Sequence, residues 1–181
     1  MLTLTFFIKI IFDSYITVLL LRLWMECSRC DFHNSLSQLV IKTTELFNIR
    51  FIPSIKRINF SILFFSIFFS VIKYFFLNFI QFKIFLINYF VFLISIVSLL
   101  QLLINLVSWI IIIRSIRSWA IINYTDADIV FFQLTEPLMI RIRHYIPIIG
   151  GIDFSGMIAI LLLYIFNCIL KDLFPSFNFY L

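Results

Sequence analysis

The chain has 181 residues, of which 63% are hydrophobic and 13% charged, and it carries a formal net charge of +5. Soluble domains carry roughly 25% charged residues, so this composition excludes an ordinary soluble enzyme or binding domain and indicates an integral membrane protein. In a soluble chain the excess positive charge would suggest a nucleic-acid partner. Here the basic residues flank long apolar runs, so we expect the lipid bilayer as the partner and no nucleic-acid binding.

The first apolar run, residues 2–24, is interrupted only by Lys9, Asp13 and Arg22 among charged residues. About 23 residues at ~1.5 Å per residue cross a hydrocarbon core of ~30 Å, which predicts a transmembrane helix. No basic cluster precedes the run and no small-residue cleavage site follows it, so we expect this helix to be retained. Lys9 and Asp13 are four residues apart and can pair, either as a buried pair facing another helix or as part of an ion or proton relay.

Residues 25–57 are mixed in polarity, and their pattern predicts a short amphipathic helix lying on the membrane surface. The residues at helical spacing on its less polar side are Leu36, Leu39, Val40, Thr43, Leu46 and Phe47. Residues 58–80 are then apolar around a single charge, Lys73, and predict a second transmembrane helix. Asn59 stands at its entrance as a plausible N-cap.

A long apolar run, residues 84–113, exceeds what one bilayer crossing requires. No Gly, Pro or charged turn divides it, so we predict one tilted helix within it, at about residues 88–113. Trp109 near its end suits the aromatic belt of a membrane protein. We expect this third helix to end at Arg114 and Arg117.

The second polar segment, residues 123–144, contains Glu136 beside Pro137, a pair that fits the first turn of a helix. The basic residues that follow fit a last helical turn or a contact with anionic lipid: Arg141, Arg143 and His144.

All three glycines of the chain lie in or beside the stretch that follows: Gly150, Gly151 and Gly156. With Pro147 they predict a shaped turn, because glycine permits backbone angles that other residues resist. A fourth transmembrane helix is predicted at about residues 152–170, with Asp153 as its N-cap and Lys171 just past its end.

The two halves of the chain resemble each other. The matching positions are Leu21-Arg22 with Ile113-Arg114, Thr44-Glu45 with Thr135-Glu136, Arg50 with Arg141, and residues 53–61 with 147–155. We therefore predict an all-α protein of two tandem repeats, residues 1–80 and 84–173, followed by a tail at 174–181. Each repeat is expected to run helix, amphipathic segment, helix, and to cross the membrane twice, so that both have the same orientation. This differs from the inverted repeats of many transporters.

Most basic residues lie in the two polar segments, against Lys73 and Lys83 around the connection between the second and third helices. The positive-inside rule therefore places both polar segments in the cytoplasm and both termini outside.

The motif that most resembles a metal-binding or redox site is Cys27-Ser28-Arg29-Cys30 with His33. It lacks the second ligand pair of a closed zinc site, and Asp31 stands where c-type haem attachment requires His. We expect no metal, no cofactor and no disulfide there, and Cys168 is most simply a small apolar residue. The sequence contains no nucleophile–base pair, phosphate-binding glycine loop or zinc-protease motif, so we expect no catalytic residues and no enzyme.

With these residues assembled, the chain resembles the YggT family, also called YlmG, of bacterial inner-membrane and plastid proteins. The second repeat carries the more specific motif, in the residues Thr135, Glu136, Pro137, Arg143, Pro147, Gly150, Gly151 and Asp153, after Arg114. The first repeat keeps Arg22, Asn34, Ser37, Gln38, Thr44 and Pro53. It departs from the family at Leu46, Lys56, Arg57 and Asn59, and the second repeat departs at Arg141 and His144.

The resemblance implies a multi-pass protein of the bacterial plasma membrane without established catalysis. Family members are connected with tolerance of osmotic stress, and in plastids with division, nucleoid distribution and cytochrome assembly. A scaffold or assembly role would unite these, with other membrane proteins or a second copy as partners. The alternative is a small ion-flux protein, which would need the intramembrane charges Lys9, Asp13 and Lys73 around a watery path.

Overall fold

The computed structural model describes residues 2–45, 60–82, 89–119, 125–145 and 154–174. Within these ranges the regular structure is entirely helical, which confirms the predicted all-α fold class. The helices are α1 (Leu2–Cys27), α2 (Ser35–Thr44), α3 (Phe60–Phe82), α4 (Tyr89–Trp119), α5 (Asp126–Tyr145) and α6 (Ser155–Leu173). Four of them, α1, α3, α4 and α6, are long and apolar enough to cross a membrane.

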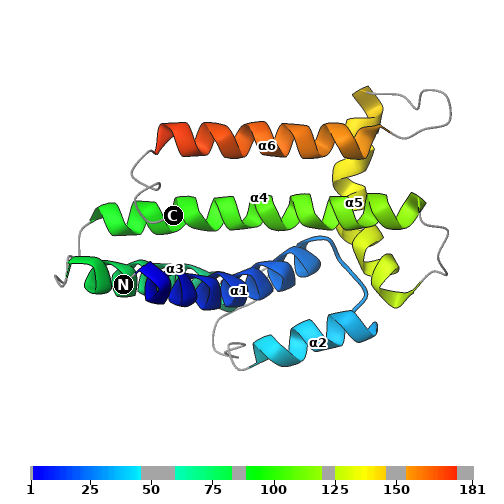
Figure 1. Ribbon diagram of the computed structural model, residues 1–181. Coiled ribbons are helices and arrows are strands. Elements are labelled where there is room, and N and C mark those ends of the chain that lie inside the picture. Colours follow the sequence, from blue (N-terminus) through cyan, green and yellow to red (C-terminus); the bar gives the residue numbers. More distant parts are fainter. Residues whose placement is uncertain (1, 46–59, 83–88, 120–124, 146–153, 175–181) are drawn as a thin grey trace.

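Figure 1 shows these four helices lying alongside one another, with α2 and α5 gathered at one end of the bundle. Along the chain α1 and α4 run toward that end, and α3 and α6 run away from it. Helix α4 is central, because it contacts α1, α3, α5 and α6, whereas α2 contacts α1 and α5. The two amphipathic segments are therefore placed together, although their first residues, Ser35 and Asp126, are 91 positions apart in the sequence.

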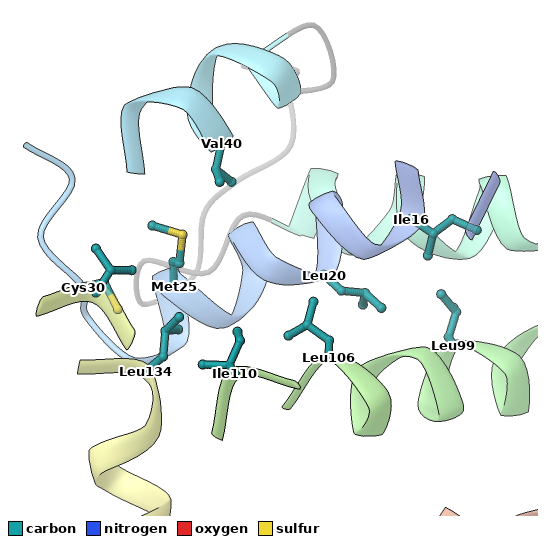
Figure 2. Close-up of a cluster of buried hydrophobic side chains, with 10 residues drawn as sticks. Ile16, Leu20, Met25, Cys30, Val40, Leu99, Leu106, Ile110 and Leu134 are labelled. Carbon is teal, nitrogen blue, oxygen red and sulfur yellow. The ribbon is translucent and has the colours of Figure 1, made fainter. Parts of the chain in front are cut away.

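A cluster of buried apolar side chains joins the two halves of the chain at this end (Figure 2). Its members come from α1, α2, α4 and α5 and from the turn after α1: Ile16, Leu20, Met25, Cys30, Val40, Leu99, Leu106, Ile110, Val130 and Leu134. The cluster therefore packs the two halves of the chain against each other at this end of the bundle.

Helix α1 ends in a turn whose backbone geometry normally favours glycine, although no glycine is present. Arg29 adopts a left-handed φ of 55°, and the Cys30 N–H donates to the Met25 carbonyl oxygen at 3.1 Å. This six-to-one hydrogen bond is that of a Schellman motif, which is often accompanied by an apolar contact between the same two positions. Cys30 and Met25 both belong to the buried cluster, so packing stabilises the strained position of Arg29.

The predicted amphipathic helix of the first polar segment is present as α2, and its placement on a membrane surface stays a prediction. Val40 is buried within the chain together with Ser37 and Thr44, whereas Leu39 is 64% exposed. The face of α2 that packs against α1 and α5 is therefore not simply its most apolar face. It also contains the Thr44 hydroxyl, which accepts a hydrogen bond from Arg22. Leu46 and Phe47 lie outside the described residues.

Helix α4 is longer than predicted, since it continues past Ile113 to Trp119 and includes Arg114 and Arg117. At ~1.5 Å per residue its 31 residues extend about 46 Å, well beyond a hydrocarbon core of ~30 Å. The two arginines do not end the helix, because both find partners in and beside α5.

The prediction that Glu136 and Pro137 open a helix is wrong. Helix α5 begins ten residues earlier, at Asp126, and Pro137 lies inside it. The start is favoured by Asp126 and Asp128 in the first turn, and the Asp128 carboxylate accepts a hydrogen bond from the Thr125 N–H at 2.7 Å. The basic last turn is confirmed for Arg143 and His144.

Helix α6 begins at Ser155 with Phe154 at its N-cap position, and it includes Lys171 in its last turn rather than ending before it. The predicted caps Asp153 and Asn59 and the turn at Pro147, Gly150 and Gly151 lie outside the described residues. Gly156 is buried where a Cβ would lie 2.9 Å from the Ser115 hydroxyl oxygen, so its lack of a side chain lets α6 approach α4 closely.

Candidate functional site

The first arginine cluster consists of Arg22 and Glu26 on α1 and Thr44 on α2. The buried Arg22 guanidinium donates to the Thr44 hydroxyl oxygen at 2.6 Å and lies 3.4 Å from the Glu26 carboxylate. The Thr44 hydroxyl in turn donates to the Val40 carbonyl oxygen at 2.6 Å. The hydroxyl thus acts as acceptor and donor at once, which fixes α2 to the end of α1.

The second arginine cluster consists of Arg114 on α4 with Thr135, Glu136 and Arg143 on α5. Arg114 donates to the Thr135 hydroxyl oxygen at 2.5 Å and to the Glu136 carboxylate at 2.7 Å. The other Glu136 oxygen accepts from Arg143 at 3.1 Å, and the Thr135 hydroxyl donates to the Phe131 carbonyl oxygen at 2.7 Å. One carboxylate therefore bridges two guanidinium groups, an arrangement of charge-assisted hydrogen bonds.

The two clusters use corresponding residues in the same way. In each, an arginine near the end of a membrane-spanning helix donates to a threonine on the amphipathic helix that follows, and that threonine donates to the carbonyl four residues earlier. The carboxylates differ, because Glu26 lies on the arginine's own helix whereas Glu136 lies beside the threonine. Glu45, which the alignment of the halves matches to Glu136, is exposed at the C-cap of α2.

A third contact fixes the beginning of α5 to the end of α4. The Arg117 guanidinium pairs with the Asp128 carboxylate, with one hydrogen bond of 2.7 Å from Nη2 to Oδ2. The hydrogen bond from Arg117 and the one from the Thr125 backbone lower the pKa of Asp128 to about 2.

The turn after α1 is bonded directly to α5, across 102 residues of sequence. The Asp31 N–H donates to the Gln133 side-chain oxygen at 2.9 Å, and the Gln133 amide nitrogen donates to the Asp31 carboxylate at 3.1 Å. This reciprocal pair adds a polar link between the halves beside the buried cluster.

Inside the membrane-spanning bundle, Lys73 on α3 is 1% exposed and lies between α1 and α4. Its ammonium nitrogen is 2.8 Å from the Asp13 carboxylate and donates to the Ser98 hydroxyl oxygen, also at 2.8 Å. The structure therefore brings Asp13 to a lysine 60 residues away in sequence, a pairing that the sequence analysis did not consider, while Lys9 lies one turn earlier on α1, half-buried.

The Cys27–Cys30 motif is divided between two environments. Cys27 is exposed, whereas Cys30 is packed in the buried cluster. Burial, together with the negative charge of Asp31, raises the pKa of the Cys30 thiol to about 11, which favours the thiol over the thiolate near neutral pH. In the part of the chain that the structure describes, no three His, Cys, Asp or Glu side chains are close enough to hold a metal ion.

The predicted motif residues fall into three groups. Six of them form the two arginine clusters: Arg22, Thr44, Arg114, Thr135, Glu136 and Arg143. Gln38 is exposed and donates to the His33 carbonyl oxygen at 3.3 Å, and Pro137 is exposed within α5. Pro53, Pro147, Gly150, Gly151 and Asp153 lie outside the described residues.

Sequence reasoning missed Glu26, Ser98 and the Asp31–Gln133 pair. Glu26 stands four residues after Arg22, which is the spacing already noted for Lys9 and Asp13, so the same rule could have found it. The partners of Lys73 and Gln133 had no local signal, because both contacts join distant parts of the chain.

The geometry of the described residues defines a class of protein: an all-helical membrane protein in which this part of the chain has four helices long enough to span a membrane and two shorter helices fixed at one end by arginine clusters. The family model described as CCB3/YggT matches residues 93–174. The chain is 36% identical to the protein named Uncharacterized protein YggT of Escherichia coli strain K12. The alignment extends over 169 residues, which is 91% of this chain and 87% of that protein. The chain therefore belongs to the YggT family, as the sequence analysis predicted.

Two further relatives match over similar lengths. A Vibrio alginolyticus protein described as lying in the proC 3′ region is 33% identical over 175 residues, 94% of this chain and 95% of that protein. A Haemophilus influenzae protein is 28% identical over 173 residues, 92% of this chain and 91% of that protein. No solved structure matches the chain.

Replacing Thr44 by Val tests the first arginine cluster. The substitution keeps the shape of the side chain but removes the only hydroxyl that links Arg22 to α2, so a buried guanidinium loses an acceptor. We expect a loss of about 1–3 kcal/mol in the free energy of unfolding, measured by denaturant titration in mild detergent micelles. The matched control is Thr43→Val, because Thr43 is exposed and its hydroxyl bonds only to its own helix. Equal stability of the two variants would contradict this role of Thr44.

The pH response of Asp128 tests the third contact. Its pKa is lower in the folded protein, about 2, than the ordinary value of 3.8, so its pairing with Arg117 stabilises the fold fully above about pH 4. That contribution is lost as the pH falls through about 2. Carboxyl-carbon NMR titration in micelles, with Asp128→Asn to assign the signal, is expected to give a midpoint well below 3.8. A midpoint near 3.8 would mean that Arg117 does not hold this carboxylate.

Proposed function

We propose that the chain is a non-enzymatic scaffold or assembly factor of the bacterial inner membrane, with α2 and α5 on the cytoplasmic side. In this role it holds two amphipathic helices in a fixed arrangement against the membrane and presents them to other membrane proteins. Its contribution to osmotic stress tolerance would then be indirect, through the assembly of those proteins.

The observation that carries this proposal is that the charged motif residues are engaged with one another, while apolar side chains are left outward. Within the arginine clusters, each guanidinium bonds to a threonine or a carboxylate of the same cluster. On one side of α5, Ile129, Phe132 and Ile140 are exposed at helical spacing, and Ile140 is 59% exposed. In such helices the polar groups hold the helix in place and the apolar side chains face outward. This arrangement is typical of a surface that binds another protein or a membrane, and not of a catalytic site.

Exposed cations accompany these apolar side chains. Lys42 on α2 and Arg141 on α5 are both exposed, in the segments whose basic residues predict a cytoplasmic location. Apolar side chains beside basic residues suit the interface of a membrane with anionic lipid, where each basic residue contributes about 1 kcal/mol of attraction.

The ion-flux alternative receives less support from the intramembrane charges. A conducting path would keep Asp13 and Lys73 in contact with water, but the Lys73 ammonium is enclosed by Asp13 and Ser98. Such a three-membered contact serves to hold α1, α3 and α4 together, which a scaffold requires.

Site-specific photo-crosslinking in living cells tests the proposal. A benzophenone amino acid at Ile140 or Leu39, on the outward sides of α5 and α2, is expected to form discrete adducts with a different membrane protein. The control position is Leu161, which is similarly exposed but lies within the membrane-spanning part of α6. Adducts at neither Ile140 nor Leu39, or the same adducts at all three positions, would contradict a scaffold.

Flux measured in proteoliposomes separates the two functions. We expect potassium and sodium flux no greater than in empty vesicles, both for the natural chain and for Asp13→Asn. Flux above that level that falls in Asp13→Asn would overturn the scaffold proposal and make α1 part of an ion path.

A further inference from the structure

A stripe of carboxamide side chains runs along the membrane-spanning part of the second half. Gln101 and Asn105 are four residues apart on α4 and therefore share a face of that helix. Asn167 on α6 donates from Nδ2 to the Asn105 Oδ1 at 2.8 Å. The three side chains form what we call the amide stripe (Gln101, Asn105 and Asn167), which none of the contacts described above employs.

The amide stripe lies deep in the predicted hydrocarbon region. Asn105 is 13 residues from the Ser118 end of its apolar span, or about 20 Å at ~1.5 Å per residue. Its side chain is nevertheless exposed on the surface of the single chain. A carboxamide facing lipid has no hydrogen-bonding solvent, so exposure at this depth is costly and indicates that a partner covers it.

The hydrogen bonding of the stripe is also incomplete. Among the described residues, the buried side-chain atoms without a hydrogen-bond partner are Asn34 Nδ2, Gln101 Nε2 and Asn167 Oδ1. Two of these three atoms belong to the amide stripe. Buried polar atoms in native proteins are nearly always bonded, so the single chain leaves part of the hydrogen-bonding capacity of the stripe unused. These two atoms are enclosed within the chain, whereas the exposed Asn105 carboxamide can be reached by a partner.

We propose that this face of α4 and α6 binds a second copy of the chain, and that the two Asn105 side chains pair reciprocally across a two-fold axis. In the single chain the Asn105 Oδ1 accepts one hydrogen bond, from Asn167, which leaves it a second lone pair. Each Asn105 Nδ2 then donates to the Oδ1 of the other copy. A carboxamide is self-complementary in this way, as an isologous interface requires.

A second copy fits better than an unrelated protein because it brings the same carboxamide to the same depth. Two chains inserted in the same orientation are related by an axis along the membrane normal, so their Asn105 side chains are level. Trp109 lies one turn further on the same face and is 64% exposed, and Tyr164 on α6 is also exposed. These large side chains would supply the packing that association within a membrane requires beside its hydrogen bonds.

The proposal does not depend on the proposed scaffold function, since it uses α4 and α6 within the membrane rather than the outward sides of α2 and α5. A dimer could form whether or not other proteins bind at the cytoplasmic end.

Disulfide crosslinking in native membranes tests the interface directly. The three cysteines Cys27, Cys30 and Cys168 are first replaced by Ser. In that background Trp109→Cys is expected to give a disulfide-linked dimer on oxidation with copper phenanthroline. The matched control is Leu100→Cys on the same helix, exposed but about 140° around it from Asn105 at 3.6 residues per turn. No dimer at Trp109→Cys, or equal dimer at both positions, would overturn the proposal.

The role of Asn105 is tested by counting subunits of fluorescently labelled chains in liposomes of increasing lipid-to-protein ratio. Asn105→Leu is expected to weaken dimer formation about tenfold, as the loss of two interhelical hydrogen bonds implies. Asn105→Gln, which keeps the carboxamide, is expected to retain more of the dimer than Asn105→Leu. A natural chain that is monomeric throughout, or dimerisation unchanged in Asn105→Leu, would overturn the proposal. The crosslinking experiment keeps Asn105 in place, so it would detect a dimer even if the Asn105→Leu variant misfolds.

Discussion

A guanidinium group that is buried or partly buried and must find an acceptor is the constraint on which the rest of this structure depends. Arg22 and Arg114 lie near the ends of membrane-spanning helices, where leaving the charge unpaired would be costly. In both cases the acceptor includes a threonine on the next amphipathic helix. Helix α2 has only ten residues, too few to be stable alone in water, so its position depends on these contacts.

The same logic extends through the bundle, because apolar helices gain little from the hydrophobic effect once they are in lipid. Specific polar contacts and close packing must choose their neighbours. Lys73 joins α3 to α1 and α4, the Ser70 hydroxyl donates to the Ser95 carbonyl oxygen between α3 and α4, and Gly156 permits the approach of α6. Helix α4 takes part in each of these contacts, which explains its central place in Figure 1.

Much of the fold was predictable, since composition and apolar length gave the class and the four spans. The match of Arg22 with Arg114 and of Thr44 with Thr135 was visible in the sequence, but the hydrogen bond from each arginine to its threonine was not. Local rules failed where a distant contact decides the outcome. Helix α4 continues through Arg114 because α5 supplies acceptors. Helix α5 begins earlier, at Asp126, so Pro137 lies inside it and not at its start. The repeat itself stays a prediction.

Hydrogen exchange of the α2 amides in bicelles tests most directly whether the arginine clusters hold the amphipathic helices in place. The natural chain is expected to exchange slowly across Ser35–Thr44, and replacing Arg22 by Met is expected to accelerate that exchange while leaving α5 protected by its own cluster. The reciprocal change, Arg114→Met, is expected to accelerate exchange in α5 first. Unchanged protection of α2 in Arg22→Met would show that lipid adsorption alone positions the helix, and would contradict the account.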